Sequence, residues 1–289
     1  MSDPRRHLAN PRVAHASLAG QVTADHFSDG TWQRVITPVA NVHRDPLNPA
    51  LERQLLMGEP FLVLEEIKDH AFGMCGLNGY VGYVPRAHLA ELPETSHVVS
   101  VSRTLLFDRP DLKAPAPVPL SLGTQVLVVG EENRFAEIDT GGFVPVAHIR
   151  PSAASEPDPV SVAERLLGTP YLWGGNSAFG IDCSGLVQIA MNACGFYCPG
   201  DSDQQLSELG EPMASVSSVE RGDLLFWKGH VAWARDTTTL IHANAGAMAV
   251  AIEDRATAIK RISDQGDGPL LAHLKPSKTP LAHRAPIGS

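Results

Sequence analysis

Cys183 is the residue of this chain best placed to act as a nucleophile. It follows a glycine-rich loop within Asp-Cys-Ser-Gly, and the apolar residues after it recur with helical spacing: Leu186, Val187, Ile189, Ala190 and Met191. The pattern predicts a helix that begins at or beside Cys183. Unpaired backbone N–H groups and the helix dipole favour a thiolate there, and such settings lower a cysteine pKa from ~8.5 to about 3.5–7.5. The thiolate is the nucleophilic form of the side chain.

Two later histidines have the setting of a base and its orienting partner. His230 opens an apolar run directly after Lys228-Gly229, and His242 ends the run of residues 239–241. We expect both at strand ends, where neighbouring antiparallel strands would bring the two imidazoles to one edge of a sheet. One ring would take the thiol proton while the other orients it. The pattern indicates nucleophilic catalysis by a cysteine and two histidines.

Five short motifs, in order, resemble those of the NlpC family of papain-like cell-wall cysteine peptidases. They are Pro-Tyr-Leu-Trp-Gly-Gly from residue 170, Asp-Cys-Ser-Gly from 182, Gly-Asp-Leu-Leu-Phe from 222, Gly-His-Val from 229 and His-Ala from 242. The resemblance covers roughly residues 159–262, and a series of motifs in one order is far more specific than one isolated motif. It implies that Cys183 is the nucleophile, His230 the base and His242 the orienting residue.

The same resemblance implies further site residues within these motifs. Tyr171 would help to stabilise the oxyanion, although both Tyr171 and Trp173 could also be ordinary packing aromatics. Asp182 would bind a substrate amine, and as a favoured helix-capping residue it could also cap the helix. Ser184 and Trp173 are expected to contact the substrate.

A loop after the predicted helix matches a family segment of the form Pro-Arg-x-Ser-x-x-Gln. Pro199, Ser202 and Gln205 are in place, but Gly200 stands where the family has arginine. Ser202 remains able to hydrogen-bond a peptide. The missing arginine weakens any inference about what this loop contacts.

Composition excludes several classes of partner. The 289 residues, 43% of them hydrophobic and 19% charged, suit two or three small globular domains. A formal net charge of −9 argues against nucleic acid or an anionic membrane as the main partner. No apolar run is long enough for a signal-peptide core or a membrane span, so we expect a cytoplasmic protein.

The cysteines predict neither a disulfide framework nor a metal site. Cys75, Cys183, Cys194 and Cys198 lack disulfide-framework spacing, and a reducing compartment would leave them as thiols. Cys194 and Cys198 form a lone pair, without a second Cys or His pair at zinc-ligand spacing. We therefore expect no metal and no cofactor.

An internal repeat precedes the cysteine region. Gly-Tyr-Val-Pro-Arg-Ala-His-Leu at residues 82–89 recurs as Gly-Phe-Val-Pro-Val-Ala-His-Ile at 142–149. Each copy predicts short, turn-bounded strands that close into a small barrel, and the Gly-aromatic-Val-Pro ending resembles bacterial SH3-like domains. His88 and His148 occupy equivalent repeat positions, which favours a shared structural role over catalysis.

These observations predict an α+β protein. An N-terminal arm (1–30) would precede SH3-like barrels at 31–95 and 96–152, a papain-like peptidase domain at 153–275, and a tail at 276–289. In the peptidase domain, the cysteine-bearing helix would pack on an antiparallel sheet with strands at 224–227, 231–234, 240–243 and 249–252. A preceding helix at 160–167 would end at Gly168, and the chain from Asp264 onward would be loosely held.

The resemblance implies hydrolysis of murein peptides that have a free N-terminal L-alanine, between γ-D-glutamate and the diamino acid, in peptidoglycan recycling, and this is the favoured function. Relatives of this architecture close the cleft around that alanine with an acidic residue and a tyrosine of the first barrel, here Glu59 and Tyr80, together with Asp182. The first two are expected to be exposed turn residues. An amidase or acyltransferase on the same fold and a non-enzymatic wall-peptide binding protein remain alternatives.

Overall fold

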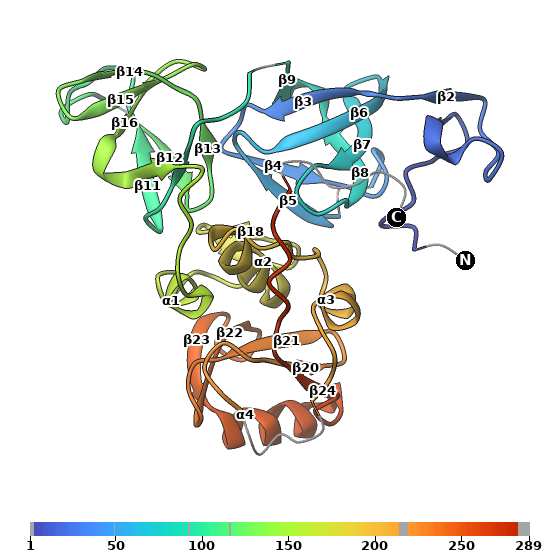
Figure 1. Ribbon diagram of the computed structural model, residues 1–289, viewed down its shortest axis with the longest axis vertical. Helices are drawn as coiled ribbons and strands as arrows, with labels where there is room; N and C mark the ends of the chain where they lie inside the picture. Colours follow the sequence, from blue (N-terminus) through green and yellow to red (C-terminus); the bar gives the residue numbers. More distant parts are fainter. Residues whose placement is uncertain (1–2, 49, 92, 116, 214–218, 283–289) are drawn as a thin grey trace. The chain divides into compact units, whose positions relative to one another are not determined.

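The computed structural model describes residues 3–48, 50–91, 93–115, 117–213 and 219–282. Its contacts divide the chain into two units, one formed by the described residues up to 153 and the other by the described residues of 154–281. The first is built almost entirely of strands, and the second combines helices with a sheet (Figure 1). Among the described residues, no helix has the length and apolar character needed to cross a membrane.

The first repeat folds as a small barrel (Figure 1). Its main sheet has the order β8-β7-β6-β3-β9, and β4 pairs with β5. Alternating apolar residues fill the interior, among them Val35, Phe61 and Val84. The strands are β3 (Thr31–Val35), β4 (Val39–Val42), β5 (Arg53–Leu56), β6 (Pro60–Ile67), β7 (His70–Cys75), β8 (Val81–Pro85) and β9 (Leu89–Ala90).

The second repeat has the same build in smaller sheets. These have the orders β13-β10-β17, β11-β12 and β14-β15-β16, around a core that includes Leu120, Ile138 and Val144. The strands are β10 (His97–Val99), β11 (Arg103–Leu106), β12 (Val118–Ser121), β13 (Gln125–Val126), β14 (Val128–Glu132), β15 (Phe135–Ile138), β16 (Phe143–Pro145) and β17 (Ile149–Pro151). Met57 of the first barrel also packs in this core.

The repeated Val-Pro has one structural consequence in both copies. The strand stops at the proline, and a single 3-10 turn follows: η2 (Arg86–His88) in the first barrel and η3 (Val146–His148) in the second. The carbonyl of His88 accepts from Ile36 N at 2.9 Å, and that of His148 accepts from Ser100 N at 2.9 Å. The two histidines therefore close their barrels in the same way, as the repeat predicts.

The N-terminal arm is part of the first barrel's packing. Leu8 and Val13 are buried with Leu62 and Met74 of the barrel, and Arg12 pairs with Glu65 at 2.8 Å. The arm contains β1 (Val13–His15), η1 (Ala16–Leu18) and β2 (His26–Ser28), and β1 runs parallel to β2. It thus contributes buried apolar surface instead of lying on a finished domain.

The second unit is centred on an antiparallel sheet of order β23-β22-β21-β20-β24. Its strands are β20 (Leu224–Trp227), β21 (His230–Ala234), β22 (Thr239–Asn244), β23 (Ala249–Asp254) and β24 (Ala272–Leu274). The four apolar runs of the sequence became the first four strands. The prediction of α+β organisation is confirmed.

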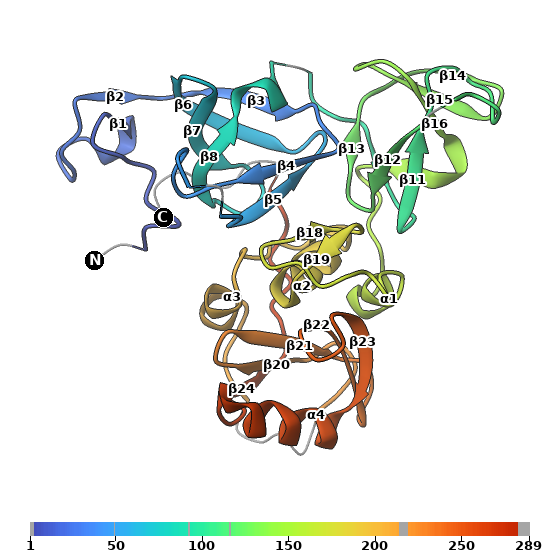
Figure 2. The same ribbon diagram turned by 180° about the vertical axis from the view of Figure 1, so that it is seen from behind.

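Two helices cover opposite sides of this sheet (Figure 2). The central helix α2 (Cys183–Ala193) packs against β21 and β22, and also against α1 (Pro159–Glu164) and the hairpin of β18 (Asn176–Ser177) and β19 (Gly180–Ile181). Every residue of α2 from Cys183 to Met191 is buried, as expected for a helix enclosed on all sides. On the other side, α4 (Arg255–Ile262) packs against β22 and β23.

Two segments differ from the sequence expectations. Helix α1 ends at Glu164, before the predicted end at Gly168, and turns fill the gap. The segment from Asp264 is not loose as far as residue 281: it forms η5 (Ser263–Asp267) and β24, and then Thr279 O accepts from Tyr197 N and Leu281 N donates to Gly195 O. Backbone hydrogen bonds, which composition does not reveal, hold this segment. Residues 283–289 of the predicted tail lie outside the described residues.

Candidate active site

Cys183 is the first residue of α2, and Asp182 is its N-cap. Asp182 Oδ1 accepts from Gly185 N at 2.6 Å, and Oδ2 accepts from Gly174 N at 2.9 Å. A single carboxylate therefore caps the helix and holds the preceding glycine loop against it. The sequence expectation of a helix start at Cys183 is correct.

Gly185 permits close packing between that loop and the first turn of α2. A Cβ atom on Gly185 would lie 2.4 Å from the carbonyl oxygen of Gly175 and 3.1 Å from Asp182 Oδ1. Any other residue would push the loop away from the helix start. The Asp-Cys-Ser-Gly motif thus combines a nucleophile, its cap and the space for the adjacent loop.

Cys183 lies beside the turn that introduces the first histidine. Its Sγ donates to the carbonyl of Gly229, with a separation of 3.9 Å. Gly229 has φ of +72°, and the turn formed by Lys228 and Gly229 places His230 opposite Trp227 in the β20–β21 ladder. The left-handed backbone favours glycine at this position. A tight hairpin thereby brings the base to the nucleophile's side of the strand end.

His230 and His242 are in direct contact, as the sequence predicted. His230 Nε2 and His242 Nδ1 are hydrogen-bonded at 2.9 Å, and the ring centroids lie 5.1 Å apart. Burial lowers the pKa of both imidazoles, and for His230 the charge of His242 lowers it further. Both rings are therefore neutral at pH 7, the form in which His230 can accept a proton.

The position of His242 within its strand was predicted incorrectly. His230 begins β21, but His242 lies inside β22 and its side chain is fully buried. β22 continues to Asn244 because residues 242–244 pair with 249–251 of β23. His242 is thus held on both sides by the sheet, which suits an orienting residue.

Two residues that the sequence analysis missed lie behind this histidine. Glu253 Oε2 is 3.2 Å from His242 Nε2, and Arg261 contacts the same carboxylate with Nε at 2.9 Å and Nη2 at 2.7 Å. Glu253 is on β23 and Arg261 on α4. A charged residue at the end of an alternating strand gives only a weak signal, because the neighbour it meets depends on the strand register.

Tyr171 lies in the loop before α2. Its N–H donates to Met248 O at 2.9 Å, and it forms a bridge with Ile181, directly before the helix cap. Burial raises the pKa of its hydroxyl, and the charges of Cys183 and Asp182 raise it further. At neutral pH the phenol is a hydrogen-bond donor in the field of the nucleophile. Its predicted oxyanion role stays a prediction.

Ser184 and the residues of the following loop form one hydrogen-bonded group. The Ser184 hydroxyl is buried and donates to Asp182 Oδ1 at 3.0 Å, and its carbonyl accepts from Gln205 Nε2 at 2.9 Å. Gln205 also donates to Pro199 O at 3.0 Å, so it ties α3 (Ser202–Glu208) and its loop to the nucleophile helix. Ser202, half-buried, begins α3. Substrate contacts of Ser184 and Ser202 stay predictions.

Trp173 is the most exposed large apolar side chain of the nucleophile loop. It is 70% exposed, and Leu172 and Phe179 of the same loop region are 40% and 38% exposed. A packing aromatic would be buried, so its exposure argues against that reading. The exposure is compatible with the predicted substrate contact, which stays a prediction.

Glu59 and Tyr80 do not have the exposed positions expected from the sequence. Both are buried, and Glu59 occupies the turn position that Thr124 has in the second barrel: each carbonyl accepts a backbone N–H, from Val35 and from Val99. Burial raises the pKa of Glu59 to about 8, with Leu56 N–H and Arg53 opposing it. Glu59 is therefore mostly neutral at pH 7, which makes it a poor partner for an ammonium.

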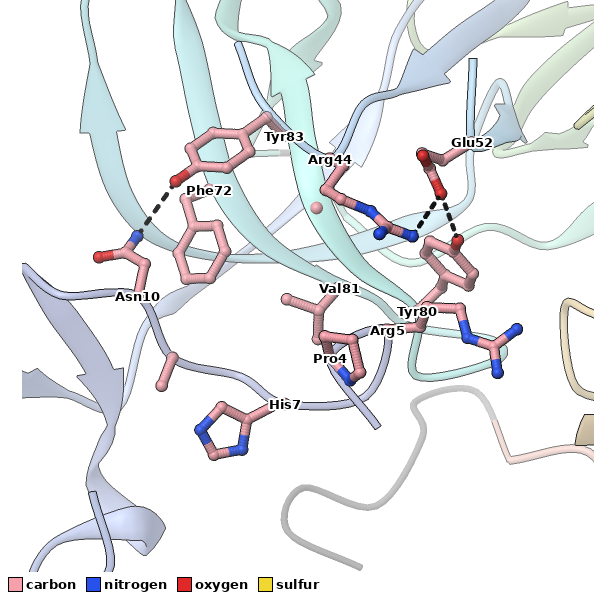
Figure 3. Close-up of a pocket in the computed structure, with 12 residues that line it drawn as sticks. Pro4, Arg5, His7, Asn10, Arg44, Glu52, Phe72, Tyr80, Val81 and Tyr83 are labelled. Atoms are coloured by element: carbon pink, nitrogen blue, oxygen red, sulfur yellow. Dashed lines mark hydrogen bonds and ion pairs between the residues drawn. The ribbon is translucent and has the colours of Figure 1, made fainter. Parts of the chain in front are cut away.

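Tyr80 lines a pocket with a different carboxylate (Figure 3). Its hydroxyl donates to Glu52 Oε2 at 3.1 Å, and Arg44 Nη2 contacts the same oxygen at 3.1 Å. The pocket, of about 140 Å³, also has Arg5, His7 and Asn10 of the N-terminal arm in its wall. Glu52 was not identified from the sequence because it lies outside the repeated motifs.

The remaining cysteines are buried, and burial raises the pKa of Cys75, with the charge of Glu59 adding to this effect. Within the described parts of the chain, no cluster of three or more His, Cys, Asp or Glu side chains has the arrangement of a metal site.

Comparison with known protein families gives two matches in chain order. Residues 42–89 match the bacterial dipeptidyl-peptidase Sh3 domain, and residues 168–261 match the NlpC/P60 family. The second match contains Cys183, His230, His242 and Glu253. The first contains Glu52, Glu59 and Tyr80.

Individual relatives cover more of the chain. Dipeptidyl-peptidase 6 of Lysinibacillus sphaericus is 26% identical over 73% of this chain and 87% of its own length. The gamma-D-glutamyl-L-lysine dipeptidyl-peptidase of Bacillus subtilis is 29% identical over 61% of this chain and 64% of its own, just under two thirds. The crystal structure of an NlpC/P60 family protein from Bacillus cereus shares the fold: the TM-score is 0.71 at 19% identity, over 86% of this chain and 100% of that one.

Proposed function

We propose that this chain, which contains an NlpC/P60 peptidase domain and a bacterial SH3 domain, is a cysteine peptidase that hydrolyses γ-D-glutamyl bonds in murein peptides. The observation that carries the proposal is the start of α2: a cysteine at the first helical position, beside the turn that leads into two hydrogen-bonded histidines. Two relatives named as dipeptidyl-peptidases, one of them for gamma-D-glutamyl-L-lysine, support the choice of bond.

The residues present are sufficient for acyl transfer without a cofactor. Cys183 Sγ attacks the γ-carbonyl carbon of D-glutamate as its proton passes to His230. The tetrahedral oxyanion would be stabilised by the hydroxyl of Tyr171 and backbone N–H groups at the start of α2. His230 then gives its proton to the amine of the diamino acid, which leaves, and a thioester remains. Water, deprotonated by His230, releases the dipeptide and restores the thiol.

The direct test uses purified full-length protein with L-Ala-γ-D-Glu-L-Lys and with its meso-diaminopimelate counterpart. We expect mass spectrometry to detect the L-Ala-D-Glu dipeptide and the free diamino acid with the wild type. Cys183→Ala should produce neither. Cleavage of the L-Ala–D-Glu bond, or release of ammonia from an amidated peptide without chain cleavage, would replace this function with another reaction of the same fold.

We further propose that the peptide must have a free N-terminal amine, and that Glu52 is the residue of the first barrel that favours this cation. The pairing of Glu52 with Tyr80 and its place in the pocket wall support the choice, whereas the raised pKa of Glu59 disfavours that residue. N-acetylation should lower kcat/KM at least tenfold, the factor that ~1.4 kcal/mol produces. Glu52→Gln should reduce this ratio and Glu59→Gln should not. Equal rates for both peptides on the wild type would remove the requirement.

A free-amine requirement fits the recycling of wall fragments inside the cell, because the intact wall presents that amine in acylated form. This role and a cytoplasmic location are part of the proposal. Cell fractionation followed by immunodetection tests the location. Recovery of the protein with the envelope, together with cleavage of intact wall, would contradict the recycling role.

A further inference from the structure

Glu253 and Arg261 form the outer end of a hydrogen-bonded series that begins at His230. The guanidinium of Arg261 contacts both carboxylate oxygens of Glu253, and its Nη1 donates to Gln265 Oε1 at 2.8 Å. Hydrogen bonds from Arg261 hold the pKa of Glu253 below its usual range. Glu253 is therefore ionised at neutral pH. An ionised carboxylate can only accept hydrogen bonds.

The chemistry of the carboxylate determines where each proton lies in the two rings. His242 Nε2, 3.2 Å from Glu253 Oε2, must carry a hydrogen to bond it. A neutral imidazole has one N–H, so Nδ1 of His242 is an acceptor. That nitrogen can bond Nε2 of His230, at 2.9 Å, only if His230 Nε2 carries the hydrogen. The lone pair of His230 is consequently on Nδ1.

We propose that Glu253, held by Arg261, is a positioning residue for the cysteine chemistry, because it fixes the tautomers of both histidines so that Nδ1 of His230 is the base. The catalytic part of this inference rests on the proposed peptidase function. In the first step the proton leaves Cys183 Sγ for His230 Nδ1, which produces a thiolate and an imidazolium. Throughout this step Nε2 of His230 keeps its hydrogen bond to His242.

The charges of the outer pair largely offset each other. His242 contacts His230 on β21 and Glu253 on β23, and Arg261 on α4 reaches it through Glu253. Cys183 on α2 contacts the carbonyl of Gly229, the residue before His230. Glu253 favours the imidazolium and Arg261 opposes it. Glu253 and Arg261 therefore act mainly by orienting the two histidines, and they change the net charge behind the rings little. Removing only the negative charge would add an uncompensated cation behind the histidines.

Nuclear magnetic resonance of the wild-type protein tests the tautomers without any substrate. In ¹⁵N-histidine-labelled protein at neutral pH, His230 and His242 should both appear as Nε2–H tautomers, with signals assigned by loss in His230→Ala and His242→Ala. Nδ1–H tautomers for either ring would overturn the proposal. Because this measurement needs no turnover, it stays informative if the proposed substrate is not cleaved.

Glu253→Gln tests the functional consequence. The amide oxygen would accept from Arg261, so the amide N–H₂ would face His242 Nε2 and favour the opposite tautomers. We expect kcat on the tripeptide to fall roughly tenfold to a hundredfold, with KM within about twofold. This is the range seen in metalloenzymes when a group that hydrogen-bonds a metal-bound histidine is removed. The pH profile of Cys183 alkylation by iodoacetamide should also change, because the thiolate–imidazolium pair needs His230 Nδ1 as its proton acceptor.

Glu164→Gln is the matched control, because it removes another carboxylate of the same unit that binds arginines, here Arg221 and Arg235. It should leave kcat and the alkylation profile unchanged. Wild-type kcat and alkylation in a folded Glu253→Gln would refute the positioning role. An equal loss in both variants would assign the effect to general stability and refute it as well. If Glu253→Gln does not fold, the histidine tautomers measured in the wild-type protein decide whether the proposal holds.

Discussion

Among the described residues of the second unit, two histidines contact carboxylates, and these two contacts differ in what the histidine contacts next. His242 meets Glu253 at 3.2 Å and continues through His230 to the turn that contacts Cys183. His273 meets Asp223 at 2.8 Å, with both side chains almost fully buried, and joins β24 to the turn before β20. Asp223 Oδ2 also accepts from Glu220 N, which fixes that turn. The same chemical pair can therefore serve reactivity or architecture, and its neighbours decide which.

The largest expected effect is at the nucleophile. Cys183→Ala should lower kcat/KM by at least roughly a thousandfold while the fold survives, because it removes the atom that attacks. Hydrolysis assays and circular dichroism check both statements. Cys194→Ala, which changes a buried cysteine at the opposite end of α2, is the control and should retain activity. Wild-type turnover in Cys183→Ala would show that Cys183 is not the nucleophile.

Substitution of His230 and substitution of His242 should lower activity to different extents. His230→Ala should be nearly as damaging as loss of the nucleophile, whereas His242→Ala should leave residual activity, because water or a neighbour can partly orient His230. Steady-state kinetics with folded variants measures the difference. His148→Ala, in the second barrel, should stay close to wild type. A milder effect for His230→Ala than for His242→Ala would reverse their roles.

Loss of the His273–Asp223 contact should lower the stability of the protein and leave its turnover unchanged. His273→Ala leaves Asp223 buried without this partner, and breaking a buried pair in this way costs about 3–5 kcal/mol. We expect a clear fall in Tm and in the free energy of unfolding, with kcat of the folded fraction unchanged. Asp223→Asn gives a second variant of the same contact. A loss of kcat without a loss of stability would show that the two contacts are less distinct than the structure indicates.

The smallest effect concerns reactivity within the intact protein. Iodoacetamide at mildly acidic pH should label Cys183 first, because a helix N-terminus and transfer of the thiol proton to His230 favour its thiolate. Burial raises the pKa of Cys75 and makes it unreactive in this range. Peptide mapping by mass spectrometry gives the order of labelling. Faster labelling of Cys194 or Cys198 would contradict the prediction, and His230→Ala should slow the labelling of Cys183.

The reactive centre could be predicted from the sequence because its signals are local. The helix at Cys183, its Asp182 cap, the strand runs with His230 and His242, and the duplicated Val-Pro are all contiguous patterns. Local patterns determine secondary structure and turns directly. They therefore predicted the α+β class and the meeting of the two histidines.

The supporting residues could not be predicted in the same way. Glu253 meets His242 only because β22 and β23 pair Leu240 with Glu253 and His242 with Ala251, a register that the separate strands do not specify. Glu59 was expected in an exposed turn but is buried by barrel closure, and Glu52 reaches Tyr80 from a different strand region. Each depends on contacts between residues distant in the chain.

The position of β24 has a consequence for protein synthesis. β20 has four buried apolar residues, Leu-Leu-Phe-Trp, and one of its edges pairs with β24, which leaves the ribosome much later. Until then a nascent chain presents an apolar strand with unpaired backbone groups, the kind of edge that recruits other chains. Translation arrest between residues 227 and 272 would therefore yield an aggregation-prone fragment, and the His273–Asp223 contact marks the completion of a protected sheet.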